Sequence, residues 1–381
     1  METSKKDYRN WFGIVNQGVK IFFYAGIFWL IQGCAIPVDG TPIPTNTTIP
    51  TDAFTNTPAV TSTSSSTPQP SLTYTPFPTA TGTPTAESTI EVIDTIVSER
   101  DGMTLVYVPE GEFMMGADAR IGFEACKKLL APYVDNYVCS KVVYSDEEPV
   151  HAVWLDEYWV DQTEVTNAMY AALLNQVGNK VEWGDPWYGA SDPEARIQEK
   201  DGVWVVEEGY EDHPVTLVTW HGAHSYCERV GRRLPTEAEW EKAARGTDER
   251  IYPWGDEFNG EMLNFCDRDC EFLANSNYDD GYETTAPVGS YPQGASPYGA
   301  LEMAGNVREW VFDRYARRYY ERSEYRNPDG PEESLGDIRV WRGGSWSDTG
   351  DDTRITGRHS DVPTHEWIDI GFRCVLSDSS Q

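Results

Sequence analysis

Positive charge is scarce in this sequence: 30 lysine and arginine residues stand against 62 aspartate and glutamate residues, which leaves a formal net charge of -32. A chain with this balance repels nucleic acid and anionic membrane surfaces, so binding to DNA or RNA is a poor hypothesis. A solvated, soluble surface explains most of the excess carboxylates. The remaining carboxylates suit a hard cation such as calcium, which prefers oxygen ligands.

Cysteine is also scarce, and none of the seven cysteines forms a C-x-x-C pair, which argues against a zinc site. The cysteines are Cys34, Cys126, Cys139, Cys227, Cys266, Cys270 and Cys374. When Cys34 is set apart, an even number remains, which in an exported protein suggests disulfides. The pattern of the residues alone does not define how they pair.

The apolar run near the N-terminus, residues 21–31, is short for a full membrane span. Basic residues precede it at Lys5, Lys6, Arg9 and Lys20. A basic region followed by a short apolar core is typical of a signal peptide, so we expect residues 1–34 to direct export.

The end of this segment resembles a bacterial lipobox, because the aliphatic Ile31 and the small Gly33 precede Cys34. In this interpretation Cys34 is the lipidated first residue of the mature protein. An uncleaved membrane anchor and ordinary secretion with an unrelated cysteine are the alternatives. All three export the domain, so we expect it at the cell envelope, anchored to the membrane, with an envelope protein or an extracellular ligand as its partner.

Residues 35–99 are rich in threonine, serine and proline, especially up to about residue 90, and that part carries almost no charge and few bulky side chains. Such a segment cannot bury enough apolar surface to fold, and its prolines favour extended conformers. We therefore predict a disordered linker that holds the following domain away from the membrane.

Residues 100–377 have the composition of one folded domain, long enough to bury a large core. Predicted strands are Met103–Pro109, Glu112–Met115, His151–Val160, Arg339–Trp341 and Gly371–Val375, and predicted helices are Thr163–Leu174 with Thr166 as its cap, Trp220–Val230, and a third that begins at Thr236. Thr236 and Glu239 have the spacing of a capping box. Beyond the third helix we expect mostly turns, which gives an α+β domain with much irregular structure.

A series of short motifs follows in a characteristic order. They are Met103–Gly116, Glu148–His151, Asp161–Asn167, His213–Val215, Gly231–Glu241, Tyr252–Gly255, Ala286–Val288, Gly305–Trp310, Arg342–Trp346 and Gly371–Cys374. Together they resemble the sulfatase-modifying-factor domain of formylglycine-generating enzymes. The resemblance implies a variant of the C-type-lectin fold with bound calcium, which helps to satisfy the polar groups of irregular backbone.

The resemblance also implies two calcium sites. The first uses side-chain oxygens of Asn264 and Asp280 and carbonyls of Phe265 and Tyr282, and the second uses carboxylates of Glu302 and Glu309 and carbonyls of Gly305 and Val307. Alternate carbonyls from one turn plus a carboxylate meet calcium's demand for several oxygens. The alternative for Glu309 is a salt bridge to a nearby arginine.

Cys227 and Cys374 match a disulfide pair of the same family. Cys266 and Cys270 are close enough in sequence for a local bridge, and Cys126 with Cys139 would staple an insertion. The alternative for each is a free buried thiol.

The sequence departs from the family at the catalytic positions. The formylglycine-generating oxidase holds copper(I) between two cysteines after the Gly-Gly-Ser motif, and here Asp348 and Thr353 stand in their places. Neither is a soft ligand of the kind copper(I) prefers. Ser345 is kept, but without an evident base it is interpreted as structural. His221 and His224 are spaced to share a helix face, and polar surface positions explain them better than a metal site does.

Two functions follow from these observations. The leading hypothesis is a non-catalytic, calcium-stabilised binding or accessory domain whose recognition surface lies between Trp346 and Trp367. The residues predicted to contact its ligand are Asp348, Asp351, Asp352, Arg354 and Arg358. Polar and aromatic side chains on irregular loops over a rigid scaffold are common in binding sites. The alternative is a formylglycine-generating-type oxidase or another metal-dependent oxidative maturation enzyme.

Overall fold

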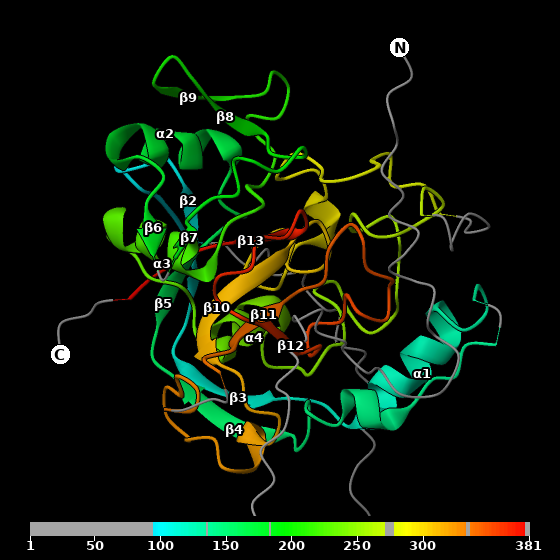
Figure 1. Cartoon of the computed structure of the whole chain (residues 1–381). Helices are drawn as coiled ribbons and strands as arrows, with labels where there is room; N and C mark the ends of the chain where they lie inside the picture. Colours follow the sequence, from blue (N-terminus) through cyan, green and yellow to red (C-terminus); the bar gives the residue numbers. More distant parts are fainter. Residues whose placement is uncertain (1–93, 135, 183, 271–277, 333–335, 378–381) are drawn as a thin grey trace, which may run out of the picture. The chain divides into compact units, whose positions relative to one another are not determined.

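The computed structural model describes residues 94–134, 136–182, 184–270, 278–332 and 336–377, which are coloured in Figure 1. The predicted signal peptide, the proposed lipidation site Cys34 and nearly all of the predicted linker lie outside the described residues. Within the described part of the chain, no helix combines the length and the apolar character needed to cross a membrane.

The first of two larger sheets has four antiparallel strands. They are, in spatial order, β1 (Thr95–Val97), β2 (Thr104–Val108), β5 (Tyr158–Asp161) and β14 (Val375–Leu376). The sheet therefore brings both ends of the domain together. Because Ile96 pairs with Leu105, the folded domain begins a few residues before the predicted boundary at residue 100.

The second sheet lies in the middle of the described unit (Figure 1). Its strands are, in order, β12 (His359–Asp361), β11 (Arg339–Arg342), β10 (Arg308–Arg314) and β13 (Ile370–Phe372), and only the β10–β13 pair is parallel. β10, in the interior of this sheet, was not predicted. It carries charged residues at both ends and within it, so its pattern does not alternate as a half-buried strand does.

Three two-stranded sheets complete the strands. They are β3 (Gly111–Met115) with β4 (His151–Leu155), β6 (Val181–Glu182) with β7 (Asp185–Pro186), and β8 (Ile197–Lys200) with β9 (Val203–Val206). The single strand predicted for residues 151–160 is therefore wrong. The chain changes direction at Asp156 and Glu157, and β4 and β5 pair with different partners.

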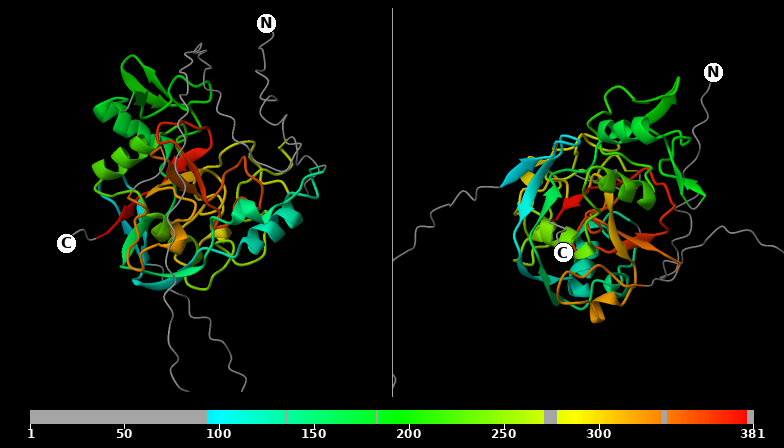
Figure 2. Two further views of the ribbon diagram at one scale, coloured as in Figure 1. Left: turned by 60° about the horizontal axis from the view of Figure 1, so that its bottom comes forward. Right: turned by 90° about the vertical axis from the view of Figure 1, so that its left-hand side faces the viewer.

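The three predicted helices are present. They are α2 (Asn167–Val177), α3 (Trp220–Arg229) and α4 (Glu237–Arg245). Threonine hydroxyls cap all three, and Thr236 with Glu239 forms the predicted capping box. A further helix, α1 (Ala119–Leu129), was not predicted and lies away from the two larger sheets (Figures 1 and 2). Short 3-10 turns occur at η2 (Lys141–Tyr144), η3 (Pro292–Gly294) and η4 (Tyr319–Glu321).

The helices and sheets enclose two apolar clusters. Trp310 and Trp240 are fully buried, one in each cluster, and each indole N–H has a partner: Trp310 donates to the carbonyl of Val218 and Trp240 to the carboxylate of Glu309. The predicted Cys227–Cys374 disulfide joins α3 to the C-terminal segment, and both cysteines are fully buried. Disulfides also join Cys126 to Cys139 and Cys266 to Cys270, so of the alternatives left open for these four cysteines the bonded one is observed.

Candidate functional site

Asp348 and Thr353, the two positions predicted to stand where the family holds copper, follow β11 on a loop held by oxygen-bearing side chains and by backbone carbonyls. Arg308 donates two hydrogen bonds to the carboxylate of Asp348, from Nε to Oδ2 at 2.8 Å and from Nη2 to Oδ1 at 2.6 Å. Thr353 is fully buried, and its hydroxyl donates to the carbonyl of Gly350 at 3.2 Å. Both side chains are thus engaged within the protein.

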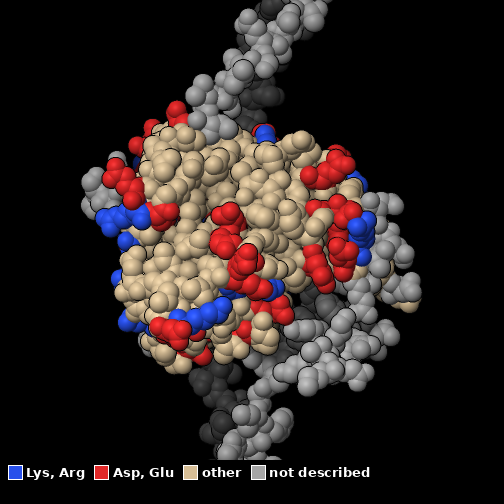
Figure 3. Space-filling view, turned by 90° about the horizontal axis from the view of Figure 1, so that it is seen from above, with Lys and Arg blue, Asp and Glu red and all other residues tan. Residues whose placement is uncertain are grey.

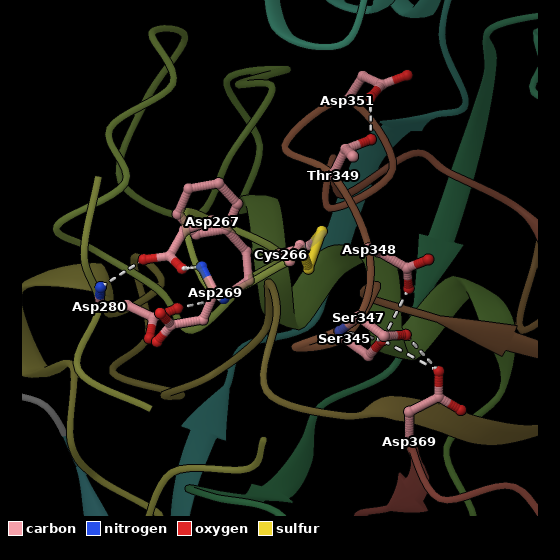
Figure 4. Close-up of a disulfide and its surroundings, with 12 residues drawn as sticks. Cys266, Asp267, Asp269, Asp280, Ser345, Ser347, Asp348, Thr349, Asp351 and Asp369 are labelled. Atoms are coloured by element: carbon pink, nitrogen blue, oxygen red, sulfur yellow. Dashed lines mark hydrogen bonds between the residues drawn. A yellow bond between two sulfur atoms is a disulfide. The ribbon is translucent and has the colours of Figure 1, made fainter. Parts of the chain in front are cut away.

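Serine hydroxyls and a second carboxylate surround this ion pair. Ser345 Oγ donates to Asp348 Oδ2 at 2.9 Å, and Ser347 Oγ donates to Asp369 Oδ2 at 2.6 Å. Arg308 also pairs with Asp369 at 2.7 Å. Burial raises the pKa of Asp348, but Arg308 lowers it more, so the carboxylate stays ionised. Figure 4 shows the four oxygen-bearing residues side by side. Ser345 therefore helps to fix the loop, which agrees with its structural interpretation.

Three of the predicted ligand contacts are buried and already paired. Arg354 makes a two-point contact with Glu147 at 2.7 and 2.8 Å, and Arg358 does the same with Glu237 at 2.7 and 2.8 Å. Asp351, only 1% exposed, accepts a hydrogen bond from the hydroxyl of Tyr144. Burial and these internal partners argue against a direct contact with a ligand, so for these three side chains ligand contact stays a prediction. Sequence position alone placed them on a loop, whereas tertiary packing turns them inward.

The surrounding ion pairs form what we call the arginine network, made of Arg342, Arg358, Glu237 and Glu241. Arg342 contacts Glu237 at 2.6 Å and Glu241 at 2.7 Å, with all three side chains inaccessible or nearly so. Burial raises the pKa of Glu237, but Arg358 and Arg342 lower it further, to about 2. The network joins α4 to β11 and to the loop before β12.

The accessible part of the predicted recognition surface is its second half, residues 359–367. Asp361 contacts Nδ1 of His365 at 2.8 Å and accepts a hydrogen bond from the indole N–H of Trp367 at 2.7 Å. Trp367 is 37% exposed. The ring of His359 stacks on Trp341 at 4.3 Å. Asp348 and Asp352 are also partly accessible, whereas residues 353–358 are buried. Most of the accessible part of the predicted surface therefore lies at residues 359–367.

The first predicted calcium set has an unsatisfied oxygen at its centre. Asn264 is 1% exposed and its Oδ1 has no hydrogen-bond partner, while its Nδ2 donates to the carbonyl of Thr284. The carboxylate of Asp280 accepts the N–H groups of Phe265 and Tyr282. Burial raises the pKa of Asp280 to about 7, and the nearby carboxylates add to this rise.

This chemistry fits calcium, because amide, carboxylate and backbone oxygens are its usual ligands. Within the described residues, no three side chains of His, Cys, Asp or Glu are arranged to hold a metal. A cation at Asn264 and Asp280 would therefore depend on backbone carbonyls, as the prediction requires. We refer to Asn264, Asp267 and Asp280 as the Asp280 set; Asp267 accepts the N–H of Asp280 at 2.7 Å.

The second predicted calcium set is more fully engaged. Glu309 accepts two hydrogen bonds from Arg373, at 2.7 and 2.8 Å, and one from Trp240, so the salt bridge proposed as the alternative is confirmed. Glu302 accepts the N–H groups of Gly289 and Tyr291. Gly305 and Val307 lie in the turn before β10. Calcium at this set remains a prediction.

Several residues of this region escaped sequence reasoning. Glu164 is fully buried close to Glu302 and Glu309, and its Oε2 has no hydrogen-bond partner. Arg308 and Glu147 were also missed as partners of predicted residues. Arg308 lies inside the quoted Gly305–Trp310 motif, which was the only signal that could have drawn attention to it.

His221 and His224 both lie on α3, as predicted. His221 approaches Glu182 at 3.6 Å, whereas His224 stacks on Trp220 at 4.9 Å. His221 is buried, so the expected surface position is wrong for this residue, whereas His224 is partly exposed.

On the surface, aspartates and glutamates gather in separate groups with fewer basic residues between them, as one face shows (Figure 3).

These features define an irregular α+β domain with two four-stranded sheets, three disulfides and a Gly-Gly-Ser loop after β11. Comparison with known families is specific: the model of the sulfatase-modifying factor enzyme 1-like domain matches residues 94–378. The chain therefore belongs to the sulfatase-modifying factor family, which includes formylglycine-generating enzymes.

Three relatives illustrate the range of this similarity. The serine/threonine-protein kinase pkn1 of Chlamydia caviae is 40% identical over 60% of this chain, but the match spans only 34% of the kinase. The formylglycine-generating enzyme of Streptomyces coelicolor is 33% identical over 71% of this chain and 88% of the enzyme. The solved structure of PvdO from Pseudomonas aeruginosa shares the fold, with a TM-score of 0.54 and 22% identity over 74% of this chain and 98% of PvdO.

Proposed function

We propose that this protein is a non-catalytic, calcium-stabilised binding or accessory domain, exported and tethered at the bacterial cell envelope. The observation that carries this proposal is the replacement of the two copper-binding cysteines by Asp348 and Thr353. Copper(I) prefers soft thiolates. Instead, Asp348 is a hard carboxylate held by Arg308, and Thr353 is buried.

The remaining cysteines supply no substitute thiolate in the described domain. All six of them, from Cys126 to Cys374, are joined in three disulfides. A disulfide sulfur is not an anionic ligand, so no pair of thiolates remains to grip a redox-active copper ion near the Gly-Gly-Ser loop. This supports loss of the oxidase reaction.

Calcium is proposed first at Asn264 and Asp280. The unsatisfied Oδ1 of Asn264 and the buried carboxylate of Asp280 would hold it, with the carbonyls of Phe265 and Tyr282. When bound, the ion would supply positive charge to a segment without regular structure and so stabilise it. The set of Glu302, Gly305, Val307 and Glu309 is kept as a second prediction.

Ligand recognition is proposed at residues 359–367, together with the accessible edges of Asp348 and Asp352. An exposed tryptophan and a histidine held by a carboxylate give this surface both apolar and polar character. The pkn1 relatives favour a module function, because a similar stretch forms part of a longer protein there. The N-terminal signal-peptide pattern and linker support display at the envelope.

Metal content and peptide oxidation test the proposal together. The full chain is purified and its metals are measured, and it is then incubated with oxygen, copper and a peptide carrying a sulfatase motif. We expect bound calcium, no stoichiometric copper or iron, and no aldehyde product. The formylglycine-generating enzyme of Streptomyces coelicolor serves as the positive control. An aldehyde formed by this chain at a comparable rate would overturn the proposal.

The oxidase alternative has one specific observation in its favour, the 33% identity to a formylglycine-generating enzyme over 88% of that enzyme. It requires a metal site different from the cysteine pair. The experiment above separates the two functions, and capture of a partner from a membrane fraction distinguishes an accessory role from binding of a small ligand. Loss of that capture in Trp367→Ala would locate the contact at residues 359–367.

A further inference from the structure

We propose that Cys266–Cys270 is a reducible disulfide that controls cation binding at the Asp280 set and the position of the 345–353 loop. The part that concerns the cation rests on the calcium site proposed above. The part that concerns the loop stands on contacts of the disulfide itself. The disulfide lies between the two regions, with Asp267 and Asp280 on one side and Asp348 on the other (Figure 4).

One contact joins the disulfide to the loop of the former copper ligands. The backbone N–H of Cys266 donates to the carbonyl of Asp348 at 2.9 Å. Asp348 is in turn gripped by Arg308 and Ser345. A displacement of Cys266 would therefore remove one of the bonds that fix the loop, while the ion pair with Arg308 would still hold the loop near its present place.

Another set of contacts joins the disulfide to the cation ligands. Asp267, inside the five-residue ring closed by the disulfide, accepts the N–H of Asp269 at 3.0 Å and the N–H of Asp280 at 2.7 Å. Asn264 and Phe265 immediately precede Cys266. The ring thus holds together the two stretches of chain that supply the cation ligands. Opening it frees Asp267 and lets these stretches separate.

This disulfide closes the smallest loop of the three. Its cysteines are 4 residues apart in sequence, against 13 for Cys126–Cys139 and 147 for Cys227–Cys374. In the chain-entropy account, a smaller loop restricts the unfolded chain less, so its loss has the smallest effect on global folding. Opening Cys266–Cys270 is therefore a local change that leaves the domain folded.

An external thiolate can reach Cys266–Cys270 more easily than Cys227–Cys374. Cys270 is partly exposed, whereas Cys227 and Cys374 are completely buried. Exchange requires that a thiolate reach a disulfide sulfur. Cys139 is partly exposed as well, so the Cys126–Cys139 disulfide is the natural control.

The reaction is an ordinary exchange with an external dithiol, either a small molecule or an exported protein. Its thiolate attacks Sγ of Cys270, forms a mixed disulfide and releases Cys266 as a thiolate, which takes up a proton. The second thiol of the dithiol then attacks the mixed disulfide and releases Cys270 as a thiol. Two electrons pass to the protein, and the external dithiol becomes a disulfide.

The redox state of the disulfide and the binding of the cation are thermodynamically linked. If reduction weakens cation binding, then the cation equally favours the oxidised form, because the coupling free energy between two equilibria is reciprocal. The oxidised protein at the cell envelope would hold calcium, and a reducing partner would release it. The 345–353 loop would change with it, which connects the redox state to the edge of the proposed recognition surface.

The test uses the full chain, limiting dithiothreitol and alkylation by iodoacetamide, followed by peptide mapping, calcium titration and hydrogen exchange. We expect Cys266 and Cys270 to be labelled first. We expect the calcium dissociation constant to rise at least about tenfold, within the usual range of coupling. We also expect faster amide exchange at Cys266 and in residues 345–353.

Two double variants separate this effect from general instability. Cys266→Ser with Cys270→Ser should reproduce the weakened calcium binding and faster exchange without reductant, while Cys126→Ser with Cys139→Ser should not. First labelling of Cys126 and Cys139, or unchanged exchange in residues 345–353 after Cys266–Cys270 opens, would overturn the inference. If the oxidised chain binds no calcium, the calcium part of the proposed function fails, and the labelling order and the exchange data still decide the redox control of the loop.

Discussion

The arginine network is fully buried and the Asp280 set is largely so, and the two regions use carboxylates in opposite ways. In the network, Arg342 and Arg358 face the carboxylates of Glu237 and Glu241 at 2.6–2.7 Å. In the Asp280 set, within the residues that the structure describes, neither aspartate forms a salt bridge, and Asn264 Oδ1 has no partner.

The difference separates carboxylates that are paired with arginines from carboxylates at which we propose a cation. The charge of a buried carboxylate is compensated when a guanidinium pairs with it, and removing either partner leaves the other charge uncompensated. The charge of a carboxylate that lies beside other acids is not compensated, so a bound cation would stabilise the folded protein there. Arg354 and Arg358, which were predicted to contact a ligand, belong to the first kind, because each is buried and paired with a glutamate.

The largest effect is expected from breaking the network. Arg342→Met keeps much of the side-chain volume but leaves Glu237 and Glu241 without this partner, so the free energy of unfolding should fall by about 3–5 kcal/mol. Denaturant unfolding of the full chain measures the loss. Arg318→Met, at a side chain 79% exposed, is the matched control and should change stability by less than about 0.5 kcal/mol. Equal effects in the two variants would contradict the comparison.

Acid should reveal the same network. The pKa of Glu237 is about 2 in the folded protein, below the ordinary value near 4.3 expected in the unfolded chain. Its contribution is therefore complete above about pH 4.3 and is lost as the pH falls toward 2, with a slope of at most about 1.4 kcal/mol per pH unit. Unfolding of wild type and Glu237→Gln between pH 2 and 5 measures this, and parallel curves would refute it.

The next largest effect on stability is expected from removing calcium, which we propose binds at the Asp280 set. At one hundred times its dissociation constant, the ion would add about 2.7 kcal/mol to the free energy of unfolding. A chelator should remove this amount from wild type and nothing from Asp280→Asn, if that set is the site. Thermal unfolding with and without calcium gives the answer. Glu302→Gln tests the second set, and calcium dependence lost there instead would move the site.

A smaller loss of stability is expected at the 345–353 loop, where Arg308 pairs with two carboxylates, Asp348 and Asp369. Asp348→Asn removes one of the two carboxylates of Arg308, but Asp369 still pairs with it at 2.7 Å. The free energy of unfolding should therefore fall by about 1–2 kcal/mol, less than in Arg342→Met. A loss as large as that of the network variant would show that Asp348 is indispensable to the core.

The smallest effect on stability is expected at the accessible surface. Trp367→Ala should lower the free energy of unfolding by less than about 1 kcal/mol, because this side chain is 37% exposed. If residues 359–367 form the recognition surface, the same variant should abolish capture of the partner. A strong loss of stability with intact capture would assign Trp367 to the fold instead.

Much of the fold was accessible from local sequence signals. Thr166 and Thr236 marked helix starts that the structure contains, because a threonine hydroxyl satisfies an N–H group at the first turn. The strand at residues 104–108 followed from its apolar pattern. β10 was missed because it contains charged residues whose partners are distant in sequence, such as Glu309 with Arg373 and Arg308 with Asp348, which no local pattern reports.

The candidate site shows the same division. The family resemblance pointed to Asn264 and Asp280 and to the positions Asp348 and Thr353, but not to Asp267, whose contact with Asp280 appears only in the structure. The absence of paired cysteines at positions 348 and 353 was plain from the chain alone. Which charged side chains face solvent was not, since Arg354 and Glu147 are 207 positions apart and meet only after folding.

The order of residues by itself therefore determined the family and the helix caps, and it placed Asp348 and Thr353, not cysteines, after the Gly-Gly-Ser motif, because each of these features depends on residue identity at short range. The tertiary structure alone decided which carboxylates are paired with arginines, which lie without an arginine partner, and which part of the 346–367 segment is accessible. Those outcomes depend on burial and on distances between segments far apart in the chain, and electrostatic free energies change steeply with both.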